Sequence, residues 1–232
     1  MRLGGTLTNR LVITIDLHLS APSRQFAQHR RLHEVARKLI DRLAVHQLPA
    51  TFGLSRPGYG QFAHWISSQP QHETALLLHP SSDWLQWGGQ GLIDEIQRLA
   101  GRMVRSVFVP GPLSQAQSLA LHAAGVSAIR GNGGTRRSWR HQQLSLFEPS
   151  IQAPSLLGRL TDWLPQRFDL AKPSQPQVLR ICGETAAQSG DWATNQAIRA
   201  IDLAAQFRDQ GGQVETLYDC AGQADQTASQ IA

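Results

Sequence analysis

The segment from Leu11 to His18 constrains the fold of this chain more than any other. Four of its eight residues are β-branched and Pro22 follows soon after, which predicts a β-strand rather than a helix. A strand this apolar is typical of a parallel sheet covered on both faces. Because side chains alternate along a strand, Asp16 and His18 at its carboxyl end are expected to point to one side and Leu17 to the other.

The carboxyl ends of such strands are where α/β proteins build their sites. Asp16 and His18 are therefore candidate site residues. The plainer alternative is that Asp16 caps the helix that follows and that His18 is an ordinary surface histidine.

Strands and amphipathic helices alternate along the first half of the chain. Residues 23–46 carry Leu32, Val35, Leu39 and Leu43 at three- and four-residue spacing, which predicts a helix with one apolar face. A strand at 50–54 follows. The same reading predicts helices at 60–68, 91–103 and 114–124, the last ended by Gly125, and strands at 73–78, 106–109 and 126–129. This alternation favours a parallel α/β barrel or an open parallel sheet.

The second half begins with a long segment that has few regular features. Residues 131–176 are rich in Gly, Arg, Gln, Ser and Pro, with a possible strand at 144–147 and a short helix near 155–164; a segment of this length is usually functional or poorly ordered. A strand at 177–182, a helix at 191–210 and a strand at 213–218 are predicted to complete the domain.

Composition limits the classes of function. The chain has 232 residues, a net charge of +5 and a pI of about 10.0, but its basic residues are scattered and no nucleic-acid motif surrounds the short basic run at 135–141. Cys182 and Cys220 have no metal-binding spacing, and neither a signal peptide nor a membrane span is evident. We therefore expect a cytoplasmic protein that binds neither nucleic acid nor membrane.

The segment from Ala36 to Phe52 carries the most specific likeness to a known family. It reads ARKLIDRLAVHQLPATF and resembles the helix and the following Pro-Ala-Thr-Phe strand of the polysaccharide deacetylase superfamily. The order of elements is similar from Leu11 to about Tyr218. The resemblance implies one domain over residues 1–220, folded as a deformed parallel (β/α) barrel of about seven strands, with 131–176 as an irregular excursion and 221–232 as a flexible tail.

The family's first two catalytic motifs are only partly kept. The first, Thr-Phe-Asp-Asp-Gly, resembles the segment from Thr14 to His18, which retains the catalytic base as Asp16 but has Leu17 where the family has a metal ligand. The second, two histidines four residues apart, matches His79 and has Asp83 in the second place.

The remaining motifs depart further. The segment from Phe108 to Gly111 lacks the arginine of the family's third motif, and Cys182 stands where the last motif has its general-acid histidine. Each loss is expected to cost on the order of a hundredfold in rate.

One interpretation is a rearranged metal site. His18, His79 and Asp83 still amount to two imidazoles and one carboxylate, a set that suits Zn²⁺, Fe²⁺ or Co²⁺. Asp16 would then be the base that activates water, and the protein would be a metal-dependent hydrolase of the amide (C–N) or ester bond of an N- or O-acetyl group on a carbohydrate.

The other interpretation is an inactive scaffold, without a metal, that binds a saccharide, another polar small ligand or a protein partner. Trp84 and Trp87 follow the second motif and are candidates for stacking on a sugar ring, although packing is the plainer role for each. Arg56 and Arg180 are candidates for substrate binding and for the place of the missing arginine, and Glu184 for the missing acid.

Overall fold

The computed structural model describes residues 9–18, 26–55, 60–78, 94, 97–98, 103–111, 113, 115–131, 145–147, 149, 151–153 and 176–222. The expected helix at 155–164, most of the expected helix at 91–103 and the tail after residue 222 lie outside these ranges.

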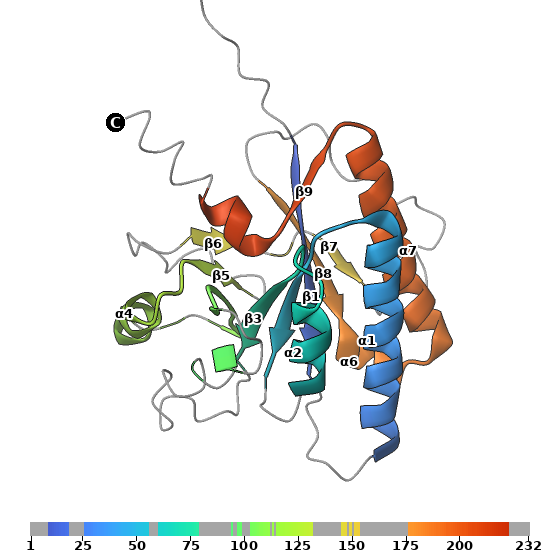
Figure 1. Ribbon diagram of the computed structural model, residues 1–232, viewed down its shortest axis with the longest axis horizontal. Coiled ribbons are helices and arrows are strands. Elements are labelled where there is room, and N and C mark those ends of the chain that lie inside the picture. Colours follow the sequence, from blue (N-terminus) through green and yellow to red (C-terminus); the bar gives the residue numbers. More distant parts are fainter. Residues whose placement is uncertain are drawn as a thin grey trace, which may run out of the picture.

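One curved sheet organises the described part of the chain (Figure 1). Its order is β6-β5-β4-β3-β2-β1-β8-β7, with β9 also paired to β1, and every pairing is parallel. The strands are β1 (Arg10–Leu17), β2 (Thr51–Leu54), β3 (Glu73–Leu77), β4 (Ser106–Phe108), β5 (Ala128–Arg130), β6 (Ser145–Phe147), β7 (Ile151–Ala153), β8 (Gln177–Cys182) and β9 (Gln213–Glu215). This confirms the expected deformed parallel (β/α) barrel.

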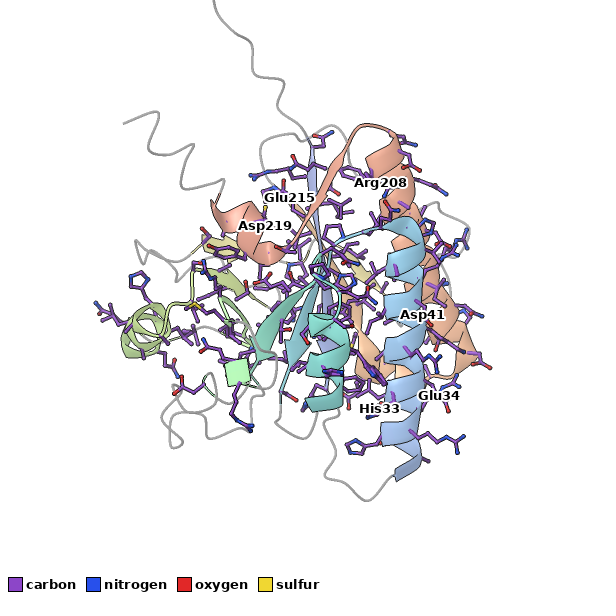
Figure 2. The ribbon with its side chains drawn as sticks, viewed as in Figure 1. His33, Glu34, Asp41, Arg208, Glu215 and Asp219 are labelled. Atoms are coloured by element: carbon purple, nitrogen blue, oxygen red, sulfur yellow. The ribbon has the colours of Figure 1, made fainter. Side chains whose placement is uncertain are left out.

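Helices cover the outer face of this sheet. They are α1 (Phe26–His46), α2 (Gly60–Ser67), α4 (Gln115–Ala123), α6 (Gly183–Gln188) and α7 (Asp191–Asp209). Two of them, α1 and α7, lie side by side (Figure 1) and are joined by Asp202 of α7, which accepts hydrogen bonds from Arg42 and His46 of α1 at 2.5 and 2.9 Å. The apolar face of α1 is fully buried, as its spacing predicts, while Glu34 and Asp41 lie on its outer side (Figure 2).

The two faces of β1 pack into different parts of the core. Ile13, Ile15 and Leu17 belong to the cluster that includes the apolar face of α1, whereas Val12 belongs to a cluster on the inner face of the sheet with Phe108. Alternation along the strand therefore turns Thr14 and Asp16 toward the interior of the barrel and Leu17 away from it. This confirms the expected orientation of the strand.

The end of the described chain differs from the sequence prediction. The last strand ends at Glu215 rather than near Tyr218, and residues 217–222 form a short helix. Thr216 caps this helix, because its Oγ1 accepts the Asp219 N–H at 3.2 Å and donates to the Asp219 carboxylate at 2.7 Å. The Thr-x-x-Asp pattern is a helix-start signal that the prediction of a strand over 213–218 did not take into account.

Further differences concern short elements. The sheet has nine described strands rather than about seven, and β7, of three residues, has no counterpart among the strands predicted from the sequence pattern. Helix α6 is also absent from the sequence prediction. Conversely, Gly125 ends α4 as expected, in a left-handed conformation with φ of 85°.

None of the helices in the described ranges combines the length and the apolar character that crossing a membrane requires.

Candidate functional site

Asp16 lies at the carboxyl end of β1, on the inner face of the barrel, and is only 4% exposed. Its register partners on the neighbouring strands are Gly53 of β2 and Cys182 of β8. Gly53 is required here because a Cβ atom at that position would lie 2.3 Å from the Phe108 ring. The space beside Asp16 is therefore occupied by an aromatic ring of β4.

Arg130 reaches Asp16 from the carboxyl end of β5, on the other side of the interior. Its Nη1 lies 2.7 Å from Asp16 Oδ1, and its Nη2 donates to Oδ2 at 3.1 Å. The same Nη1 donates to Thr14 Oγ1 at 3.0 Å, and the guanidinium lies 3.9 Å above the Phe108 ring centroid. Arg130 is fully buried, so this two-pronged ion pair and a cation–π contact provide its stabilisation.

Arg180 contacts the same carboxylate from β8. Its Nε donates to Asp16 Oδ2 at 2.8 Å, and its side chain is 17% exposed. Arg180 is the register partner of Thr14, so it points to the inner face two residues before the strand ends. Both carboxylate oxygens of Asp16 thus face positive charge.

The two arginines around Asp16 determine its ionisation state. Burial by itself would raise its pKa, but the charges and hydrogen bonds of Arg130 and Arg180 outweigh burial and hold the pKa below its ordinary value. Burial lowers the pKa of Arg130 in turn, and Asp16 opposes that shift. A carboxylate in this setting acts as a counter-ion, because protonating it would leave two guanidinium groups facing each other.

His18 follows β1 and is 8% exposed, with its Nδ1 2.6 Å from Ser55 Oγ at the end of β2. It therefore lies at the same end of the sheet as Asp16. It is buried, which does not agree with the alternative that His18 is an ordinary surface histidine. Leu17, at the family's metal-ligand position, is fully buried in the core on the opposite face and offers no ligand atom.

The other residues of the proposed metal and substrate sites lie outside the described ranges: His79, Asp83, Trp84, Trp87 and Arg56. Within those ranges no three histidine, cysteine or acidic side chains come together to hold a metal ion. The described donors therefore do not by themselves make up the family's metal site. The set of His18, His79 and Asp83 stays a prediction.

Cys182 and Glu184 lie at the end of β8 and the start of α6. The Cys182 thiol accepts a hydrogen bond from Thr185 at 3.2 Å, and Glu184 accepts one from Gln188 at 3.0 Å. Between them, Gly183 packs so closely on β1 that a Cβ atom there would lie 2.6 Å from the Asp16 carbonyl oxygen.

Sequence reasoning missed Arg130. Arg56 and Arg180 are the residues proposed for the place of the arginine missing from the third motif. The structure brings Arg180 to Asp16, and it brings a second arginine, Arg130, from β5. A signal was available, because a charged residue at the end of an apolar strand, as in VSAIR at 126–130, is the same signal that singled out Asp16.

Comparisons with known proteins define the class of fold. No family model and no curated protein matches the chain. Among solved structures, a family 4 carbohydrate esterase from Bacillus anthracis is 18% identical, with a TM-score of 0.54 over 95% of this chain and 86% of that one. A CE4 family pseudoenzyme from the same organism is 14% identical, with a TM-score of 0.56 over 92% of this chain and 66% of that one.

A peptidoglycan deacetylase from Bacillus subtilis is 11% identical, with a TM-score of 0.56, and the match covers 97% of this chain and 95% of that one. These similarities show that the chain has the fold of the CE4 carbohydrate esterases and polysaccharide deacetylases.

Proposed function

We propose that this chain is a divergent deacetylase-fold protein that binds a saccharide at the carboxyl ends of its strands and does not use Asp16 as a hydrolytic base. The observation that carries the proposal is the double ion pair of Asp16 with Arg130 and Arg180. The carbohydrate ligand is supported by the fold, since the similar structures include carbohydrate esterases and deacetylases.

A general base must accept a proton during the reaction, and it does so best when its pKa lies near the working pH. The pKa of Asp16 is instead held low by two guanidinium groups. Its Oδ2 already accepts hydrogen bonds from Arg130 and Arg180, and Arg130 lies against its Oδ1. Asp16 is thus better suited to holding two arginines in place than to activating water.

Binding can be tested directly by calorimetric titration of wild-type protein with chitotetraose, a neutral N-acetylated saccharide. We expect saturable binding that is lost when the protein is thermally unfolded. Absence of any heat of binding with chitotetraose and with an acidic N-acetylated saccharide would overturn the proposal.

The competing function is metal-dependent deacetylation through His18, His79 and Asp83. His18 supports it by its position at the strand ends next to Ser55. A divalent metal held there would polarise the substrate carbonyl and water, and His18 would be held in orientation by its Nδ1 contact, as metal-binding histidines usually are.

Metal content separates the two functions. Protein purified without chelator is expected to hold no stoichiometric zinc, iron or cobalt. A stoichiometric metal that is lost in His79→Ala and retained in His64→Ala, which changes an exposed histidine of α2, would favour the hydrolase. A cytoplasmic location stays part of the proposal; both cysteines are free thiols, as a reducing compartment requires.

A further inference from the structure

The site around Asp16 contains more positive than negative charge. Arg130 and Arg180 contribute two guanidinium groups, and among the described residues Asp16 is the one carboxylate within ion-pair distance of either arginine. These three side chains together carry a net charge of +1. The fully buried Arg130 places this charge in a region of low dielectric, where it acts strongly.

Each of the two arginines also has hydrogen-bond donors that no described residue accepts. Arg180 uses only its Nε on Asp16, so within the described ranges its two terminal nitrogens have no hydrogen-bond acceptor. Its side chain is 17% exposed, so it is partly open to solvent. The buried Nε of Arg130 likewise has no acceptor among the described residues.

We infer that the saccharide bound at this site is acidic and places a carboxylate against the terminal nitrogens of Arg180. This inference rests on the proposed function and adds the class of ligand. A guanidinium presents paired donors that match a carboxylate in plane. An acidic sugar would neutralise the surplus charge of the site, whereas a neutral sugar would cover it without compensation.

Cys182 offers an independent reporter of occupancy. It is the register partner of Asp16 on β8, the strand that also carries Arg180, and the residue is partly exposed. Cys220, the other cysteine, is fully buried. Alkylation of the native protein by iodoacetamide is therefore expected to report on Cys182, and a ligand at the site is expected to slow it.

The test compares two saccharides of similar length: chitotetraose, which is neutral, and the hyaluronan tetrasaccharide, in which glucuronate alternates with N-acetylglucosamine. We expect wild-type protein to bind the acidic saccharide at least tenfold more tightly at about 0.1 M salt, and the acidic saccharide to protect Cys182. Arg180→Gln should abolish this preference. The matched control is Arg37→Gln, which removes the same charge from an exposed position on α1.

The possible outcomes are distinct. If neither saccharide binds, the proposed function and this inference both fail. If both bind equally to wild-type protein, saccharide binding stands and the inference is overturned. Equal losses in Arg180→Gln and Arg37→Gln would attribute the preference to overall charge and also overturn it. Inorganic phosphate that protects Cys182 as well as the hyaluronan tetrasaccharide does would identify a free-anion site instead. The wild-type comparison and the protection assay need no variant to fold.

Discussion

Replacing Asp16 by asparagine keeps the shape of the side chain and removes its charge, so it isolates the role of Asp16 as a counter-ion. In Asp16→Asn, the fully buried Arg130 and the 17% exposed Arg180 lose the carboxylate that lies 2.7 to 2.8 Å away. Removing one partner of a buried ion pair typically costs about 3 to 5 kcal/mol. For a domain of this size that loss lowers Tm by about 6 to 20 °C.

The matched control is Asp202→Asn. Asp202 also pairs with Arg42, at 2.5 Å, and with His46, at 2.9 Å, but its side chain is 30% exposed. Solvent therefore screens these pairs, and removing this charge is expected to cost less than removing the charge of Asp16. Urea unfolding monitored by circular dichroism measures both variants. Equal losses of stability in Asp16→Asn and Asp202→Asn would refute the reasoning, and so would an Asp16→Asn variant within about 0.5 kcal/mol of wild type.

A second variant distinguishes lost charge from general damage. Arg130→Met removes the buried cation, so a counter-ion at position 16 is no longer required for it. Adding Arg130→Met to Asp16→Asn is therefore expected to restore part of the lost stability. An additive or larger loss in the double variant would show that Asp16 and Arg130 do not depend on each other.

Three further predictions concern pH, packing and capping. Because the folded-state pKa of Asp16 is lowered, its stabilising effect is present above the unfolded pKa of about 3.9 and is lost as pH falls through the folded pKa. The difference in unfolding free energy between wild type and Asp16→Asn should therefore be constant above about pH 5 and should disappear in acid. A difference that grows in acid would contradict this prediction. Gly53→Ala places a Cβ atom 2.3 Å from Phe108 and should lower the free energy of unfolding in urea by about 1 to 3 kcal/mol. Gly111→Ala, with open space around it, should leave that free energy nearly unchanged. Similar losses in both variants would contradict the packing argument. Thr216→Ala should lower the free energy of unfolding by about 1 kcal/mol and speed amide hydrogen exchange in residues 217–222. Thr216→Ser should largely preserve the protection of these amides. Unchanged exchange in the alanine variant would show that Thr216 is not the cap.

The sequence was informative where a local pattern determines local structure. The apolar spacing in α1 predicted both the helix and its buried face, and alternation along β1 predicted that Asp16 and Leu17 point in opposite directions. The pairing of Asp16 with Arg130 was not predictable in this way, because the two residues are 114 positions apart and meet only when the sheet curves. The same applies to residues 217–222, whose first N–H groups are accepted by Thr51 and Glu73 on β2 and β3.

The central claim is that this deacetylase fold holds Asp16 as a counter-ion rather than a base, and the most direct test is release of acetate from chitotetraose. Wild-type protein and Asp16→Asn are incubated with the saccharide, with and without added Zn²⁺, and free acetate is measured by NMR. We expect no acetate above the rate of a protein-free control in any sample. Acetate released by wild-type protein but not by Asp16→Asn, with both proteins folded, would contradict the account.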